Sequence, residues 1–323
     1  MPHDRHDEHH DHPHDHPHDH GHDHGHGHHD HAPRDFGPAF AIGTVLNVGL
    51  VLAQLVVGLS AHSMALLADA VHNLGDVLGL LLAWAAVALG RRAPSARRTY
   101  GWGRGSIMAA LFNAGVLLIG VGAIAVEAIR RFAEPGPIET GPVIWVALAG
   151  IVLNGLTAWM FARGHDDLNI RATFLHMASD ALVSLGVVVA TLGIAATGWL
   201  WLDPLASLAI AAAIAASTWG VLRQAANLAM DGVPAGVATR EVEAYLRALP
   251  GVLEVHDLHI WGLSTTETAL TAHLVHADPP PDDDFVPAAI HGLHRKFRIG
   301  HATLQLETPR LAAACRLRPA DVI

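Results

Sequence analysis

The sequence has very little cysteine and little charge. Among 323 residues there is one cysteine, Cys315, and only 15% of the residues are charged. A single cysteine excludes a disulfide framework and any zinc motif built from several cysteines. The His-Glu-x-x-His sequence of zinc proteases does not occur either. We therefore expect any metal chemistry to use histidine and carboxylate groups, without that protease motif.

Apolar residues dominate instead. They make up 51% of the chain, and the mean hydropathy is +0.32. Six long apolar segments each reach the roughly 20 residues that cross ~30 Å of hydrocarbon. A soluble helical bundle is disfavoured, because these segments leave no polar faces. The prediction is an all-α bundle of six transmembrane helices, within a domain at 36–222, with spans near 36–60, 63–90, 105–132, 140–162, 171–198 and 202–222.

The first 35 residues have a different composition. Residues 1–31 contain fifteen of the 26 histidines and eight of the 30 acidic residues, interrupted by proline and glycine. Such a segment has too few apolar residues to form a core, so residues 1–35 are predicted to be a disordered cytoplasmic tail. It has no apolar stretch of the kind found in secretory signals. We interpret it as a weak metal-collecting segment, with a solubilising tail or a purification tag as alternatives.

Arginines predict the orientation of the spans. They are concentrated in the connections after the second and fourth spans and after the sixth span, whereas the connection after the third span is acidic. The positive-inside rule then places both termini in the cytoplasm, which agrees with an even number of spans. We expect a multi-pass protein of the inner cell membrane, with the lipid bilayer as a partner. The arginines concerned are Arg91, Arg92, Arg97, Arg98, Arg104, Arg163, Arg171 and Arg223.

The last part of the chain, 233–323, is less apolar and has mixed periodicity. Two alternating, β-rich stretches lie between segments with helical periodicity, and a third strand follows. An α-β-β-α-β order predicts a ferredoxin-like α+β domain in the cytoplasm. The expected elements are a helix at 237–249, strands at 253–263 and 267–277, a helix at 285–297 and a strand at 301–307.

Two His-x-x-x-Asp pairs lie inside apolar spans. His72 and Asp76 are in the second span, and His176 and Asp180 are in the fifth. Ionisable residues inside a membrane span are costly and mark functional sites. A spacing of four places both side chains of a pair on one helix face. Two imidazoles and two carboxylates on facing helices form a tetrahedral set suited to a first-row divalent cation, with zinc first.

These pairs and their flanking sequences resemble the cation diffusion facilitator (CDF) family, in its zinc-transporter branch. The similar stretches are SMALLADAVHNLGD, TYGWGR, LNIRATFLHMASDALVSLGV, LDPLASLAIA, LAMDGVP and VHDLHIWGL. The resemblance implies a homodimer with six spans and a cytoplasmic C-terminal domain. It also implies a secondary active transporter, not an enzyme and without a nucleic-acid partner. Such a transporter exports divalent metal in exchange for protons, and its intramembrane site maps onto His72, Asp76, His176 and Asp180.

The identity of the metal rests on His72. The resemblance places aspartate there in branches that also move cadmium, iron or manganese, so histidine favours Zn²⁺ as the transported substrate. Imidazole also suits cobalt and nickel. Efflux of Co²⁺, Ni²⁺ or Cd²⁺ by the same mechanism therefore remains an alternative. A membrane-anchored metal buffer or sensor is a further alternative, although it leaves the paired His and Asp residues unexplained.

The resemblance also suggests a second, regulatory metal site in the cytoplasmic domain. The matching positions are His256, His273 and Glu307, with His301 nearby.

The chain departs from some relatives at two places. Trp102 and Gly103 offer no ligands where those relatives bind metal between the second and third spans, so we expect no metal there. Gln54 replaces an acid that is frequent in the first span. Asp69 shares the helix face of His72 and Asp76. We expect it to orient His72, with a role in guiding metal as the alternative.

Overall fold

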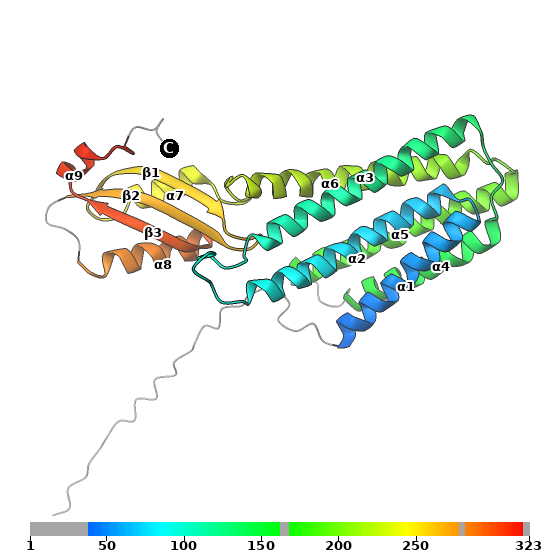
Figure 1. Ribbon diagram of the computed structural model, residues 1–323, viewed down its shortest axis with the longest axis horizontal. Helices are drawn as coiled ribbons and strands as arrows, with labels where there is room; N and C mark the ends of the chain where they lie inside the picture. The colour runs from blue at the N-terminus through cyan, green and yellow to red at the C-terminus, as the bar shows by residue number, and fades with distance from the viewer. Residues whose placement is uncertain (1–37, 162–167, 278–281, 319–323) are drawn as a thin grey trace, which may run out of the picture. The chain divides into compact units, whose positions relative to one another are not determined.

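The computed structural model describes residues 38–161, 168–277 and 282–318. The predicted tail, 1–35, lies outside these residues. Six long helices come first in the chain, and Figure 1 shows them side by side, with α3 alongside α6. Their bounds are α1 Pro38–Ser60, α2 Met64–Gly90, α3 Gly105–Ala133, α4 Thr140–Phe161, α5 Leu168–Thr197 and α6 Leu202–Ala229.

The helices have the lengths of membrane spans. Five of them, α2 to α6, are long and apolar enough to cross a membrane, and α1 contains the shorter apolar stretch Thr44–Ser60. The predicted helical membrane bundle is thus confirmed. The main difference lies in α6, which continues seven residues beyond the expected end at 222. Its last turns contain alanine, leucine and glutamine, which favour a helix even where the hydropathy falls.

Glycines bring neighbouring helices close together. A Cβ atom at Gly75 would lie 2.7 Å from the side chain of Leu117, and one at Gly120 would lie 3.0 Å from Val71. Both contacts join α2 to α3. Small residues allow this approach, and in lipid such packing replaces the hydrophobic effect as the force between helices. The helix that carries His72 and Asp76 is therefore tightly packed against α3.

The C-terminal domain has the predicted order of elements. A three-stranded sheet has the order β1-β2-β3, with β1 antiparallel to β2 and β2 parallel to β3. The α-β-β-α-β prediction is confirmed, and a short helix, α9, follows the last strand. The bounds are α7 Thr239–Arg247, β1 Val252–Gly262, β2 Thr268–His276, α8 Phe285–Phe297, β3 Ile299–Glu307 and α9 Pro309–Ala314.

The two faces of the sheet have different roles. Leu270 and Leu274 of β2 pack with Leu246 of α7 and Leu293 of α8 in the domain core. Because side chains alternate along a strand, His273 lies on the opposite face. The helix α9 contacts β2 and β3. The face away from the core thus carries polar side chains under the C-terminal segment.

Candidate metal centres

The two intramembrane pairs meet between α2 and α5. Nε2 of His72 lies 2.9 Å from an oxygen of Asp180, and Nε2 of His176 lies 3.6 Å from an oxygen of Asp76. Within each helix the histidine and aspartate are 3.9 and 3.7 Å apart. The histidine of each pair therefore faces the aspartate of the other pair. Such crossing is expected of antiparallel helices, which agrees with the orientation predicted for the second and fifth of six spans.

The distances suit one small cation. Zn–N and Zn–O bonds of about 2.0–2.2 Å place neighbouring ligand atoms of a tetrahedron roughly 3.3 Å apart. The four distances of 2.9–3.9 Å lie on either side of this value. One oxygen of Asp76 is buried without a hydrogen-bond partner in the described structure. Ligand atoms of His72, Asp76 and Asp180 all lie within 4.8 Å of one another, which is close enough to hold one metal ion, and His176 lies beside the two aspartates.

Burial differs strongly across the site. The side chain of Asp180 is only 2% exposed, whereas that of His176 is 46% exposed. An ion at this site would contact a buried aspartate and a histidine on the accessible side. This asymmetry is compatible with a site that loads and releases its ion.

Asp69 belongs to a buried polar network beside the site. Its carboxylate accepts hydrogen bonds from Gln54 at 2.8 Å and from Ser184 at 2.9 Å. Asn73 donates to the oxygen of Gln54 at 3.0 Å. Among the described contacts, the hydrogen bonds of Asp69 go to these side chains and not to His72. Asp69 therefore links α1, α2 and α5, which fixes the relative position of the two ligand helices.

A second buried aspartate fixes the start of α2. Asp203 of α6 accepts hydrogen bonds from the hydroxyl of Ser63 and the backbone N–H of Met64, both at 2.6 Å, and from the N–H of Ala65 at 3.2 Å. The first N–H groups of a helix lack partners within the helix, and a carboxylate there satisfies them. The sequence did not single out this residue. It lies one residue before a proline at the start of a span, where it resembles an ordinary helix start.

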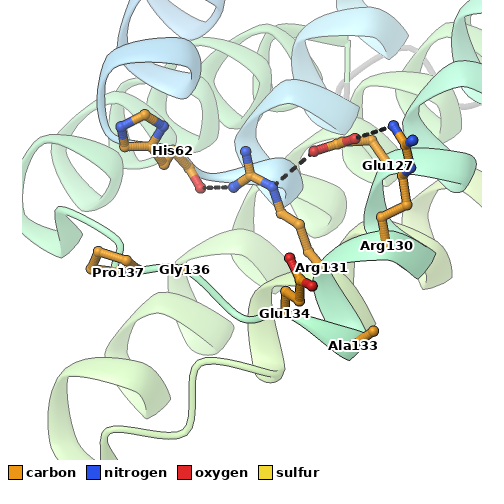
Figure 2. A pocket seen from close by; sticks show the side chains of 8 residues that line it. All are labelled: His62, Glu127, Arg130, Arg131, Ala133, Glu134, Gly136 and Pro137. Atoms are coloured by element: carbon orange, nitrogen blue, oxygen red, sulfur yellow. Dashed lines mark hydrogen bonds and ion pairs between the residues drawn. The ribbon is translucent and has the colours of Figure 1, made fainter.

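The cavity in Figure 2 lies where the α1–α2 turn meets the end of α3. It has a volume of about 710 Å³. Arg131 donates a hydrogen bond to the carbonyl of His62 at 2.5 Å and lies 3.4 Å from a carboxylate oxygen of Glu127. Arg130 lies 3.8 Å from the same carboxylate. Glu127 is therefore engaged by arginines, and we assign no metal to this cavity.

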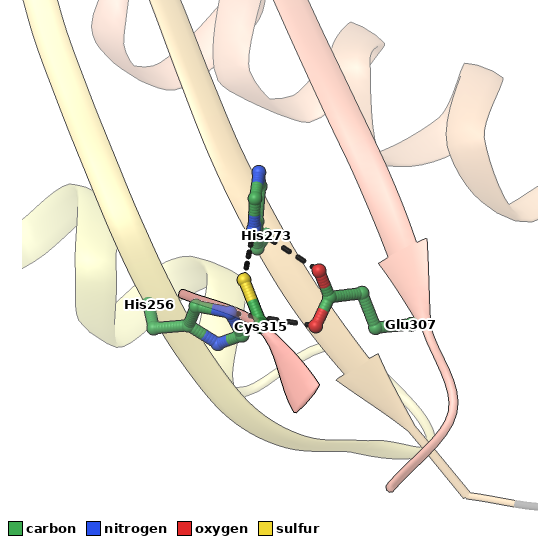
Figure 3. Close-up of side chains that lie close together, drawn as sticks. All are labelled: His256, His273, Glu307 and Cys315. Atoms are coloured by element: carbon green, nitrogen blue, oxygen red, sulfur yellow. Dashed lines mark hydrogen bonds and ion pairs between the residues drawn. The ribbon is translucent and has the colours of Figure 1, made fainter. Parts of the chain in front are cut away.

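A second cluster lies in the C-terminal domain (Figure 3), where His256, His273, Glu307 and Cys315 point toward one another. His256 and His273 are directly paired across β1 and β2, so their side chains share a face. Glu307 ends β3, and Cys315 follows α9. The chain therefore brings together four residues from three strands and the C-terminal segment.

The spacing in this cluster also suits a tetrahedral ion. Nε2 of His256 and Nδ1 of His273 lie 3.4 and 3.1 Å from the two oxygens of Glu307. The sulfur of Cys315 lies 3.7 Å from Nδ1 of His273. A Zn–S bond of about 2.3 Å predicts a sulfur–nitrogen separation of roughly 3.6 Å. Both ring nitrogens of His256 and one oxygen of Glu307 are buried without a hydrogen-bond partner in the described structure.

Two neighbouring contacts support the cluster. Asp257 lies 3.4 Å from Nε2 of His273, on the far side of the ring from the cluster. A carboxylate in this position fixes the orientation of a ligating histidine. Arg318 donates two hydrogen bonds to Glu254 on β1, at 3.0 and 2.7 Å, which hold the pKa of that carboxyl below its usual value. This ion pair holds the segment just after Cys315 against β1.

Two features of this cluster differ from the sequence prediction. Cys315 was missed, because a lone cysteine eight residues after a predicted strand has no motif spacing. The sequence carries one signal for it: Cys315 follows Glu307 closely enough for the chain to turn back and place the two side chains together. His301, in contrast, is exposed, and its ring packs edge-on against Tyr100. It lies six residues before Glu307 on one strand, which separates the two by about 20 Å.

The fold and the two clusters define a multi-pass membrane protein with metal-binding geometry both inside the bundle and in an appended α+β domain. Comparison with known proteins supports this description of two domains. The family model for the cation efflux transmembrane domain matches residues 40–228, and the model for the cation efflux protein cytoplasmic domain matches 234–309. The chain belongs to this cation efflux, or cation diffusion facilitator, family. Its members are transporters and not enzymes.

Several curated relatives cover most of the chain. The metal cation efflux system protein CzcD of Cupriavidus metallidurans is 37% identical, over 86% of this chain and 89% of its own length. The zinc transporter ZitB of Escherichia coli is 36% identical, over 86% and 90%. A cadmium, cobalt and zinc/H(+)-K(+) antiporter of Bacillus subtilis is 32% identical, over 87% and 92%.

The solved structures similar to this chain include the metal-bound C-terminal domain of CzcD from C. metallidurans. It is 39% identical and covers 22% of this chain and 99% of its own, with a TM-score of 0.21.

Proposed function

We propose that the protein is a proton-coupled antiporter that exports Zn²⁺ from the cytoplasm through His72, Asp76, His176 and Asp180. The observation that carries this proposal is the crossing of the two His/Asp pairs between α2 and α5, at distances that suit one ion. The names of two relatives, a zinc transporter and an antiporter, support the same function.

The mechanism rests on competition for the same atoms. A metal ion needs neutral imidazoles and ionised carboxylates, so protons and metal exclude each other from the site. Histidine, with an ordinary pKa near 6.5, allows this exchange at cytoplasmic pH. The site loads a metal ion from the cytoplasm, the bundle then opens to the other side, and incoming protons displace the ion. Four ligands from two helices allow such a change when the helices move relative to each other.

A flux measurement tests the coupling. The full chain is reconstituted into vesicles that contain a fluorescent zinc indicator, and zinc is added outside. We expect uptake to become faster when the vesicle lumen is made acidic, because outgoing protons then drive metal inward. A protonophore should remove the acceleration. Zinc uptake that is independent of the pH gradient would contradict antiport, and the absence of uptake would contradict transport.

Zinc is preferred over cobalt, nickel and cadmium because two imidazoles and two carboxylates can form the tetrahedral set that is typical of zinc. Efflux of those other ions by the same site is the alternative, and the names of the Cupriavidus and Bacillus relatives include metal cations in general, cadmium and cobalt. A membrane-anchored metal buffer or sensor is less favoured, since anchoring needs one span and the family is a family of transporters.

Replacing His72 with aspartate is expected to raise the ratio of cadmium to zinc transport several-fold. A carboxylate in place of an imidazole makes the site richer in oxygen and less strict in geometry, which reduces the preference for zinc. Uptake of both metals by reconstituted vesicles measures the ratio. His62→Asp serves as the control, because it makes the same change outside the two pairs. An unchanged ratio in His72→Asp would show that residue 72 does not select the metal.

We also propose the surrounding organisation. The protein is a homodimer in the inner cell membrane, with both termini in the cytoplasm. Residues 1–35 form a metal-collecting tail, 36–222 the membrane domain and 233–323 the cytoplasmic domain. The arginine-rich connections support the orientation. The match of residues 234–309 to a cytoplasmic-domain family supports the last assignment.

We further propose a regulatory metal site in the cytoplasmic domain, formed by His256, His273, Glu307 and Cys315. The buried, unpartnered nitrogens of His256 and oxygen of Glu307 favour an ion there, because polar atoms without partners are costly inside a protein. A thiolate ligand makes this site softer than the intramembrane one, so it favours zinc and cadmium over harder ions. His301 is left out of this site.

A further inference from the structure

The connection between α2 and α3 is unusually basic. It carries five arginines, and from 77 to 126 the sequence contains no aspartate or glutamate. A positive connection is expected on the cytoplasmic side, but orientation alone requires no binding site. At this connection the structure has a cavity of about 550 Å³, lined by the end of α2, the connection itself, the start of α3 and Leu263 after β1.

The walls of this cavity combine positive charge with apolar surface. Arg97 and Arg98 line it from the connection, whereas Leu89 of α2 and Met108 of α3 supply apolar side chains. Because α2 and α3 are candidate membrane spans, their adjoining ends lie at the level where lipid headgroups meet hydrocarbon. A ligand with an anionic head and an apolar body matches both kinds of wall.

The two arginines are available for such a ligand. Arg104, which also lines the cavity, is paired with Asp231. Arg97 and Arg98 are exposed, and neither forms an ion pair with a carboxylate in the part of the chain that the structure describes. The guanidinium of Arg98 stacks on the ring of Trp102, 3.4 Å from its centre. This stacking orients the guanidinium and leaves its N–H groups free to bind a phosphate.

The connection itself is ordered. Ser95 and Arg98 exchange two backbone hydrogen bonds of 3.0 Å, and the N–H of Gly101 bonds to the carbonyl of Arg98 at 2.9 Å. Gly101 has a φ of +68°, which glycine adopts without strain. The start of α3, at Gly105, adds the partial positive charge of a helix N-terminus to the same cavity. The arginines are thus presented by a fixed turn and not by a loose loop.

We propose that this cavity binds the headgroup of an anionic phospholipid, with the phosphodiester at Arg97 and Arg98 and the glycerol region against Leu89 and Met108. Phosphatidylglycerol has the required chemistry, because it combines one negative phosphodiester with an apolar body. Free phosphate offers the same kind of anionic oxygen atoms but would leave the apolar wall uncovered. Basic pockets at the ends of membrane helices recognise anionic headgroups in this way.

Native mass spectrometry of the detergent-solubilised full chain tests the proposal. Phosphatidylglycerol and phosphatidylcholine are titrated separately, and we expect clear preference for phosphatidylglycerol. The double variant Arg97→Gln, Arg98→Gln should bind it on the order of tenfold more weakly, because it removes the two guanidinium groups that contact the phosphodiester inside the cavity. The matched control Arg92→Gln, Arg223→Gln removes the same charge from exposed cytoplasmic positions outside the cavity and should bind as the wild type does.

Two outcomes would overturn the site. Equal weakening in both double variants would mean that net charge and not this cavity attracts the lipid. Displacement of phosphatidylglycerol by millimolar inorganic phosphate would mean that the cavity recognises phosphate alone. The thermal midpoint of both variants in phosphatidylcholine verifies folding. The result is independent of metal transport, because no metal is present in the measurement.

Discussion

Replacing Asp180 with alanine is expected to abolish zinc transport, with a loss of at least 100-fold in uptake rate by reconstituted vesicles. Asp180 is the most buried of the four intramembrane residues, and it makes the shortest contact of the site, 2.9 Å to His72, besides lying 3.7 Å from His176. Its removal leaves two imidazoles and one carboxylate. Changes to groups that only orient a ligand cost 10–100-fold in metal affinity or activity, so loss of a ligand should cost at least as much.

A matched control separates this effect from damage to the bundle. Asn154 is also a buried polar residue of a membrane span, 3% exposed, and it lies outside the two pairs. Asn154→Ala should therefore retain most of the flux. The assay is the uptake of zinc under an acidic lumen, with the amount of folded protein in the vesicles verified for each variant. Flux near the wild-type level in Asp180→Ala would remove this residue from the transport site.

The membrane part of the fold was predictable because each span is strongly apolar over its own short stretch of sequence. Each span carries its own hydropathy, and the ends of α2 and α3 lie within one residue of the predicted limits. The His72 and Asp76 pair was visible for the same reason, since charge is conspicuous in an apolar helix. The crossing of this pair with His176 and Asp180 followed from the predicted antiparallel direction of α2 and α5.

The polar network that positions the ligands was less predictable. Asp69 shares a helix face with His72, which suggested a direct contact, but its partners are Gln54 of α1 and Ser184 of α5. These contacts join residues 15 and 115 positions apart. No local pattern encodes which helix lies against which, so side-chain partners across a bundle emerge only with the tertiary structure. Asp203, which caps α2 from α6, was missed for the same reason.

The two proposed metal sites differ in their ligand atoms, in the elements that carry them and in how exposed they are. The intramembrane site joins two helices through nitrogen and oxygen atoms, and His176 is half exposed. The cytoplasmic site lies on a sheet, and the side chains of His256 and Glu307 are only 5% and 1% exposed. A closed set of four protein ligands is typical of tightly held zinc. The first arrangement suits an ion in transit, and the second suits an ion that stays.

Replacing Cys315 with serine is expected to weaken metal binding by the cytoplasmic domain about 100-fold, because a ligand is lost from a site where even supporting groups matter by 10–100-fold. Cys315 is the only cysteine of the chain. Any charge-transfer absorption between a thiolate and Co²⁺ or Cd²⁺ therefore reports this residue alone, even though the histidine-rich tail and the intramembrane site are present in the same molecule. The full chain in the Asp180→Ala background should show this absorption on titration with Co²⁺.

The matched comparison uses neighbouring residues of the same domain. Glu307→Gln should reduce the apparent affinity for Co²⁺ while the thiol remains, because the carboxylate lies between both histidines. His301→Ala should leave the absorption and the affinity unchanged, since this exposed histidine lies about 20 Å along the strand from Glu307. Zinc should also slow the alkylation of Cys315 in the starting protein. A chain without thiolate absorption, whose alkylation rate is unaffected by zinc, would exclude Cys315 as a ligand and leave the two histidines and Glu307 as the whole donor set.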